Sequence, residues 1–301
     1  MTSISARIRE LARQRQAVIL AHNYQAPEVQ DVADFCGDSL ELSRQAAAAG
    51  AEVIIFCGVY FMAETAAILS PSKTVLIPDP QAGCPMVSMA PVEAVRELKA
   101  KHPGAQVVTY VNSSAEVKAE SDICCTSANA AAVVAGIDPA REIIFVPDQH
   151  LGHYVQQVTG RKMILYPGCC PTHARLAPAD IVAARQAYPD AVVMIHPECR
   201  PEAVALADAV LSTSGMLRYP RESPATTFIV ATETAMLYRL RKENPGKTFH
   251  PASDLLVCPN MKRITLEKVL WSLEDMKHVV TVPEPVRIKA LRAVERMVRV
   301  G

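Results

Sequence analysis

The stretch RKMILYPGCCP, residues 161–171, is an apolar run that ends in two adjacent cysteines and a proline. A disulfide between Cys169 and Cys170 would be strained, because bridged cysteines favour a larger Cα separation and a defined torsion. Two other segments end in the same way, KTVLIPDPQAGCP at 73–85 and ASDLLVCP at 252–259. The cysteines that precede proline are 86 and 88 residues apart, and they are Cys84, Cys170 and Cys258. The chain therefore contains an internal repeat with one such thiol in each copy, and Cys169 is interpreted as a small packing residue.

Four further features recur in the same order and with a similar period. Apolar runs that end in polar residues are AVILAHNY (17–24), QVVTYVNSS (106–114) and AVVMIHPE (191–198). Serines that follow them, 88 and 87 residues apart, are Ser39, Ser127 and Ser214. A third series consists of EVIIFCG, EIIFVPD and TTFIVAT, and each Cys-Pro pair is followed by a helical pattern. Every copy is thus predicted to run strand, helix, short strand, helix, strand, helix, strand, Cys-Pro loop and helix.

The predicted strands are continuous apolar runs, which is typical of parallel sheets covered by helices on both faces. The sequence therefore predicts an α/β fold of three homologous three-layer αβα domains, with parallel sheets in a pseudo-threefold arrangement around a central active site. The landmark residues lie just after strands, where open parallel sheets bind ligands. The expected boundaries are 1–103 for the first repeat with an N-terminal helix, 104–188 for the second, 189–275 for the third, and 276–301 for a C-terminal tail that packs back on the first repeat.

Composition narrows the class of protein. Lys and Arg number 31 and Asp and Glu also number 31, so the formal net charge is zero, which argues against a nucleic-acid partner. The N-terminus has no apolar signal segment and no run is long enough to span a bilayer, so a soluble cytoplasmic protein is expected. The chain has nine cysteines and no C-x-x-C pair. In a reducing compartment such cysteines are metal ligands, catalytic or buried more often than disulfide-bonded.

Three thiols that converge from three repeats indicate a metal centre. In a 4Fe–4S cluster, three cysteine ligands leave one iron free to act as a Lewis acid. Zinc bound by the three cysteines and His173 is the alternative, because Cys170 and His173 have a chelating spacing.

The chain resembles the quinolinate synthase family along nearly its whole length. The matching stretches are ILAHNYQAPEVQDVADFCGDSLELS, PDPQAGCPM, VVTYVNSSAEVKAESD, CTSANA, PGCCPTH, IHPEC, STSGM and CPNMK. The resemblance implies a 4Fe–4S cofactor with Cys84, Cys170 and Cys258 as ligands, in agreement with the repeat. Some members carry further cysteines before the last ligand, whereas residues 252 and 255 here are Ala and Leu.

The resemblance also implies an activity and its substrates. Iminoaspartate would condense with dihydroxyacetone phosphate to quinolinate, with release of phosphate and water, in de novo NAD synthesis. An aspartate-oxidising enzyme that supplies iminoaspartate is the expected partner. Two other classes stay open on the residues alone: an aconitase-like hydro-lyase that acts on another substrate, and a non-enzymatic zinc or iron–sulfur protein.

Several strand-end side chains are candidate site residues. The predicted catalytic residues are Tyr24, Tyr110, His196 and Glu198, with Glu198 as a base beside a histidine. The predicted substrate-binding residues are His22, Ser39, Tyr110, Asn112, Ser127, His173, His196, Glu198 and Thr213. Within this set, Ser39, Ser127 and Thr213 are expected to open helices, whose N-termini bind anions. The family pattern places the three histidines in the active site and both tyrosines against substrate.

Overall fold

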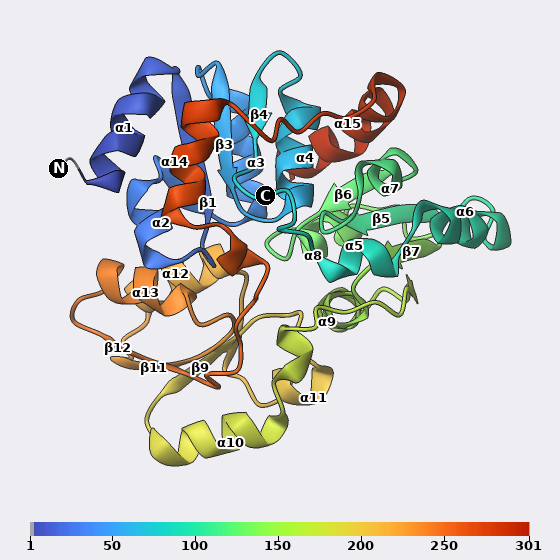
Figure 1. The fold of residues 1–301 in the computed structure, drawn as a ribbon. Coiled ribbons are helices and arrows are strands. Elements are labelled where there is room, and N and C mark those ends of the chain that lie inside the picture. Colours follow the sequence, from blue (N-terminus) through green and yellow to red (C-terminus); the bar gives the residue numbers. More distant parts are fainter. Residues whose placement is uncertain (1–2, 301) are drawn as a thin grey trace.

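A computed structural model describes residues 3–300 as three four-stranded parallel sheets with flanking helices (Figure 1). The first sheet contains β1 (Ala17–His22), β2 (Phe35–Gly37), β3 (Val53–Cys57) and β4 (Thr74–Leu76). The second contains β5 (Gln106–Tyr110), β6 (Ile123–Cys125), β7 (Ile143–Val146) and β8 (Ile164–Leu165). The third contains β9 (Val192–Ile195), β10 (Ala209–Val210), β11 (Thr227–Ala231) and β12 (Thr248–Pro251). The strand orders are equivalent, namely β2-β1-β3-β4, β6-β5-β7-β8 and β10-β9-β11-β12.

Helices alternate with these strands in the predicted order. The first repeat has α1 (Ile4–Gln14), α2 (Pro27–Val32), α3 (Ser39–Ala48), α4 (Tyr60–Leu69), α5 (Pro85–Met89) and α6 (Val92–Lys101). The second has α7 (Ala115–Ala119), α8 (Ala130–Ala135), α9 (Gln149–Thr159), the 3₁₀ turn η1 (His173–Arg175) and α10 (Pro178–Ala187). The third has α11 (Pro201–Val204), α12 (Thr213–Glu222), α13 (Met236–Glu243), the 3₁₀ turn η2 (Met261–Arg263) and α14 (Leu266–Asp275), and α15 (Glu284–Arg299) follows in the C-terminal tail. The predicted fold class is confirmed.

The central strands are apolar on both faces because helices cover both. Every residue of β3 and of β7 is buried. Side-chain caps fix where several helices begin: Asp38 and Glu41 form a reciprocal capping box at α3, and Asp148 caps α9. The positions of the strand ends and helix starts follow from these local signals, and they set the geometry of the site.

The three repeats surround a common centre, and the C-terminal segment connects the first repeat to the others (Figure 1). Helix α14 packs against α1. The chain after it pairs antiparallel with the edge of the first sheet, through a bridge between Leu76 and Val279. Helix α15 then contacts α3 and α4 of the first repeat and also α7 and β6 of the second. The tail therefore reaches two repeats, whereas the expectation for 276–301 named the first alone.

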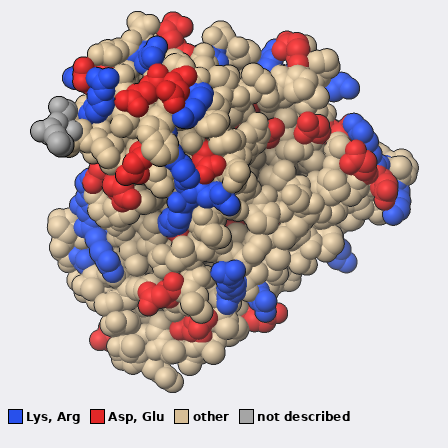
Figure 2. All heavy atoms as spheres, viewed as in Figure 1, with Lys and Arg blue, Asp and Glu red and all other residues tan. Residues whose placement is uncertain are grey.

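The described surface carries mixed charge. On the face shown in Figure 2, acidic and basic side chains are interspersed. None of the helices within residues 3–300 has both the length and the apolar character needed to cross a bilayer.

Candidate active site

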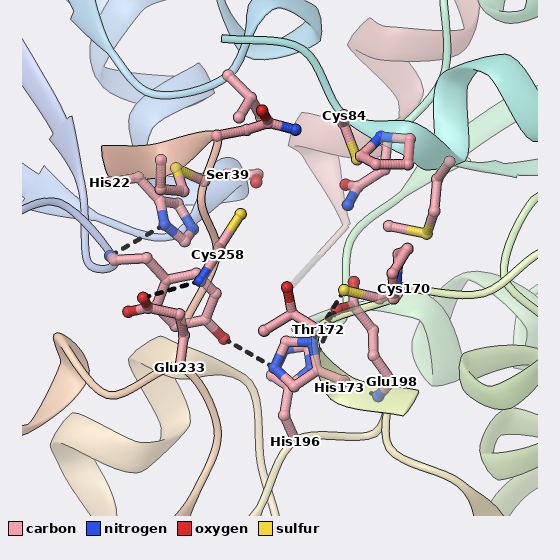
Figure 3. Close-up of a pocket in the computed structure, with 18 of the residues that line it drawn as sticks. His22, Ser39, Cys84, Cys170, Thr172, His173, His196, Glu198, Glu233 and Cys258 are labelled. Atoms are coloured by element: carbon pink, nitrogen blue, oxygen red, sulfur yellow. Dashed lines mark hydrogen bonds and ion pairs between the residues drawn. The ribbon is translucent and has the colours of Figure 1, made fainter. Parts of the chain in front are cut away.

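The carboxyl ends of the three sheets open into one cavity of about 230 Å³ (Figure 3). Its lining includes all three cysteines of the repeat, Cys84, Cys170 and Cys258. It also includes every other predicted site residue, namely His22, Tyr24, Ser39, Tyr110, Asn112, Ser127, His173, His196, Glu198 and Thr213. Segments up to about 240 residues apart in sequence are thus brought together, as the repeat predicted. The roles given to these side chains stay predictions.

Two of the cysteine loops are held by buried carboxylates. The backbone N–H of Cys170 donates to Asp148 Oδ2 at 3.1 Å, and that of Cys258 donates to Glu233 Oε1 at 3.2 Å. Asp148 and Glu233 are both fully buried, and each lies two residues after the third strand of its repeat, β7 or β11. Figure 3 shows Glu233 beside Cys258 at one side of the cavity. Two equivalent loops therefore present their thiols in equivalent ways.

Glu198 is the centre of a buried polar network. Its Oε2 lies 2.6 Å from His173 Nδ1 and 3.7 Å from His196 Nδ1. The hydroxyl of Tyr110 donates to Glu198 Oε1 at 2.5 Å. Figure 3 shows the two histidines and Glu198 next to Cys170, and the imidazole rings of His173 and His196 are stacked with centroids 4.7 Å apart. The network joins residues of the second and third repeats.

The environment sets the protonation of these groups. Burial raises the pKa of Glu198, but the nearby His173, His196 and Tyr110 outweigh burial and hold that pKa below its usual value. Burial lowers the pKa of His196 to about 3, although Glu198 opposes this effect. Burial, reinforced by the charge of Glu198, raises the pKa of Tyr110 well above its usual value. At neutral pH the site therefore holds an ionised carboxylate, a neutral His196 and a protonated tyrosine.

The second tyrosine enters the network through Thr232. The Tyr24 hydroxyl lies 2.6 Å from Thr232 Oγ1, which lies 2.8 Å from His173 Nε2. Burial raises the pKa of Tyr24 well above its usual value, so its phenol stays protonated at neutral pH. Thr232 therefore connects Tyr24 of the first repeat to His173 of the second.

The chain matches the sequence model of a family described as "Quinolinate synthetase A protein" over residues 6–299. A relative named "Quinolinate synthase" from Dehalococcoides mccartyi strain CBDB1 is 59% identical over 297 residues, which is 99% of this chain and 98% of the relative. The chain belongs to the quinolinate synthetase A family. Relatives with the same name from Geobacter metallireducens and Desulforudis audaxviator are 56% and 54% identical, over 99% and 97% of this chain and 98% and 96% of their own lengths. This is a family of enzymes, and the resemblance stated from the sequence is confirmed.

The residues of this family member fit a metal centre with three cysteine ligands. Cys84, Cys170 and Cys258 are free thiols that line one cavity. Burial raises the pKa of Cys84 to about 12, so metal binding there would displace a proton. Within residues 3–300, the only group of three or more Cys, His, Asp or Glu residues with ligand atoms all within 4.8 Å of one another is Cys170, His173 and Glu198. The three cysteines do not form such a compact set, which suits a multi-iron cluster better than a single zinc ion bound by all three.

The predicted anion-binding hydroxyls differ in their helical positions. Ser39 and Thr213 are the first residues of α3 and α12. Ser127 does not open a helix, because α8 begins at Ala130, and its Oγ instead lies 3.2 Å from His196 Nε2. Ser214 does not line the cavity and donates to Glu41 Oε2 at 2.5 Å. The expectation of a helix start at Ser127 was therefore wrong, although the side chain does line the cavity.

Asn112 has an acceptor without a partner. Its side chain lines the cavity, and its Oδ1 is buried with no hydrogen bond in the part of the chain that the structure describes. A buried carbonyl oxygen of this kind is costly unless a ligand or water donates to it.

Sequence reasoning missed several functional candidates. They are Asn23, Asp148, Thr172, Arg175, Thr232 and Glu233. Arg175 is the only Lys or Arg among the described residues that line the cavity. It lies five residues after Cys170, in PTHAR, and this position next to a candidate ligand was the available signal. Asp148 and Glu233 each lie two residues after a recurring strand, whereas the contacts that make Thr232 relevant come from other repeats.

Proposed function

We propose that this chain is a quinolinate synthase of NAD biosynthesis, which condenses iminoaspartate with dihydroxyacetone phosphate to quinolinate and releases phosphate and water. The observation that carries the proposal is the single cavity in which one cysteine from each repeat faces the network around Glu198. Family membership supports the same reaction. The reaction is proposed to take place in the cytoplasm, with small molecules as its partners and no nucleic acid or membrane.

The proposed cofactor is a 4Fe–4S cluster held by Cys84, Cys170 and Cys258. Such a cluster keeps one iron without a protein ligand and supplies a Lewis acid for a substrate oxygen. Asp148 and Glu233 hold the backbone of two of the three loops, so these thiols have little freedom before the cluster binds.

Substrate binding is assigned to donors around the cavity. Iminoaspartate carries two carboxylates and dihydroxyacetone phosphate carries a phosphate. The hydroxyls of Ser39, Ser127 and Thr213, one from each repeat, are proposed to donate to these anions, and Arg175 adds a positive charge. Asn112 Oδ1 is proposed to accept from an N–H or O–H of the bound substrate, because it has no protein donor within residues 3–300.

Proton transfer is assigned to the network around Glu198. The ionised carboxylate accepts a proton from a substrate carbon or oxygen, and the Tyr110 hydroxyl that it binds returns one. Neutral His196 accepts the backbone N–H of Glu198 at Nδ1, so its Nε2 carries the hydrogen, donates to Ser127 Oγ and leaves the Ser127 hydroxyl hydrogen for a ligand. Tyr24 and His173 are held in place through Thr232. Enclosure by three repeats limits the access of water to the imine, which hydrolyses readily.

Anaerobic purification followed by product analysis tests the proposal. The protein should contain about four irons per chain and should form quinolinate from iminoaspartate and dihydroxyacetone phosphate. An iron–sulfur protein that dehydrates another substrate but forms no quinolinate would favour the hydro-lyase alternative. A colourless protein with stoichiometric zinc would favour the non-enzymatic alternative. Coupling to an aspartate-oxidising enzyme should raise the yield if iminoaspartate is supplied directly.

A further inference from the structure

A chain of hydrogen bonds runs behind the cavity, between the first and third repeats. It joins Arg239 of α13 to Asn23, and Asn23 to Thr213 of α12. Asn23 follows β1, is fully buried and is not among the residues that line the cavity. The Asn23 side chain can therefore affect a ligand only through a neighbour.

Arg239 decides which way the Asn23 amide faces. Its Nη1 donates to Asn23 Oδ1 at 2.7 Å and to the carbonyl oxygen of Cys36 at 2.6 Å, and its Nε pairs with Glu243 at 2.5 Å. A guanidinium has donors and no acceptor, so the atom of Asn23 that faces it must be the oxygen. The NH₂ group of the same amide is then directed to the opposite side.

That NH₂ group meets the hydroxyl of Thr213. Asn23 Nδ2 donates to Thr213 Oγ1 at 2.9 Å. A hydroxyl has one hydrogen and two lone pairs, and here one lone pair is already used. Within residues 3–300 the Thr213 side chain has no other hydrogen bond, and Thr213 is buried and lines the cavity. Its hydrogen is therefore left to donate to a ligand.

The backbone of Asn23 is fixed as well. Its N–H donates to the carbonyl oxygen of Gly37, and its own carbonyl oxygen accepts from Gln30 Nε2 at 3.2 Å. The amide therefore has a defined position and a defined direction before any ligand arrives.

We propose that Asn23 is a positioning residue that holds the Thr213 hydroxyl as a hydrogen-bond donor to an anionic oxygen of the substrate. The anionic character follows from the donor itself and from its place at the first residue of α12, where the helix N-terminus favours negative charge. The identity of the substrate rests on the proposed function, but the direction of the hydrogen bond does not.

Asn23→Asp reverses this direction with almost no change in shape. The new side chain has only acceptors when ionised, so it keeps Arg239 and takes the hydrogen of the Thr213 hydroxyl. The ligand then loses a donor. Because a hydrogen bond to a charged group is strong, the dissociation constant of one anionic probe should rise by about 10- to 150-fold. The probes are quinolinate and inorganic phosphate, titrated separately into anaerobic holoenzyme.

A double-mutant cycle separates this effect from the added negative charge. Thr213→Val removes the hydroxyl and keeps the shape, whereas Thr213→Ser keeps the hydroxyl. If Asn23 acts through Thr213, Asn23→Asp should weaken binding in the wild-type background and change little in the Thr213→Val background. Cluster absorbance and melting temperature are recorded for each variant to confirm that it is folded and loaded.

Each outcome decides the inference. Equal weakening in both backgrounds, or none in either, overturns it and leaves the proposed function intact. If Asn23→Asp does not fold, the Thr213 variants are compared instead. Wild-type affinity of Thr213→Val for both probes overturns the inference. Weaker binding of a probe by Thr213→Val, together with unchanged binding by Thr213→Ser, supports it. If the variants show the expected cycle but the wild-type enzyme forms no quinolinate, the inference stands and the proposed function is contradicted. A wild-type enzyme that binds neither probe removes both.

Discussion

The three cysteine loops are similar in sequence but are held in two different ways. In the second and third repeats, a carboxylate at the end of a strand of the same repeat accepts the backbone N–H of Cys170 or Cys258. In the first repeat, β3 is followed by Gly58 and Val59, which offer no carboxylate. No such bond to the N–H of Cys84 is found in the part of the chain that the structure describes.

The first loop is completed by a distant part of the chain instead. Asp79 accepts from the backbone N–H of Gln81 at 2.8 Å and from Lys268 Nζ at 2.7 Å. Arg263 Nη1 also donates to Gln81 Oε1 at 3.2 Å. Arg263 ends η2 and Lys268 lies in α14, so both belong to the last part of the third repeat. In two loops the cysteine N–H is thus bound by a carboxylate of the same repeat, whereas the first loop lacks this bond and is joined to side chains of the third repeat.

The largest expected effect is loss of the cluster. It tests whether the first loop supplies a ligand as the other two do, although its backbone is held differently. Replacement of Cys84, Cys170 or Cys258 by Ser should abolish the cluster in every case, because each supplies one ligand. Cys169→Ser should keep it and is the matched control. The measurement is iron and sulfide per chain after anaerobic reconstitution. A Cys84→Ser protein that retains a full cluster would make the first loop different in function as well as in support.

Substitutions at Glu198 and Tyr110 should lower turnover without changing the iron content of the protein. Glu198→Gln and Tyr110→Phe should keep the cluster spectrum and lower turnover by about 10²- to 10⁴-fold, because each removes a proposed proton carrier. Turnover at saturating substrate, with iron content as the control, checks this. Either variant that keeps a third or more of wild-type turnover does not carry the proton that is assigned to it.

Ser127 differs from Ser39 because it lies before a helix and not in its first turn. Ser127→Ala should raise the dissociation constant of quinolinate or phosphate by about 10- to 150-fold, because it removes the proposed hydrogen bond to an anion. Its melting temperature should stay near that of the wild type, because Asn129 is the residue at the N-cap of α8. Unchanged affinity would remove Ser127 from the set of anion donors.

The smallest expected effect concerns Asp148 and Glu233, whose carboxylates hold two of the cysteine loops. Asp148→Asn and Glu233→Gln each leave a buried N–H with a poorer acceptor, which should cost about 1–3 kcal/mol and speed the loss of iron to a chelator. Asp79→Asn is the matched control in the first repeat and should affect iron retention less, since Asp79 does not bind the N–H of Cys84. Equal rates of iron loss for all three variants would contradict the distinction between the loops.

Much of this arrangement follows from local sequence. The Cys-Pro register and the polar residues after each strand predicted both the parallel sheets and the set of side chains in the cavity, because the position of a strand end depends on nearby residues. The helix start near Ser127 was misplaced, since Asn129 takes the N-cap position and its side chain is held by the carbonyl oxygens of Met297 and Val300. These carbonyl oxygens lie at the C-terminal end of α15, so the sequence of the second repeat alone could not predict the contact.

The remaining omissions have the same cause. Asn23, Thr232 and Arg239 matter through contacts between different repeats, and no periodic pattern encodes which side chains meet there. Asp148 and Glu233 could have been found, because both stand at the same step of the repeat, one as VPD and the other as ATE. The first repeat lacks the equivalent residue, so the alignment of the three copies concealed the pattern.

The most direct test of the central claim is the iron and acid-labile sulfide content of anaerobically purified wild-type protein, measured beside the single Ser variants of Cys84, Cys170 and Cys258. Convergence of three repeats on one cluster predicts about four irons and about four sulfides per chain in the wild type and almost none in any of the three variants. A wild-type protein that binds one zinc ion and no sulfide, or one that keeps its iron when any of these cysteines is replaced, would contradict the account.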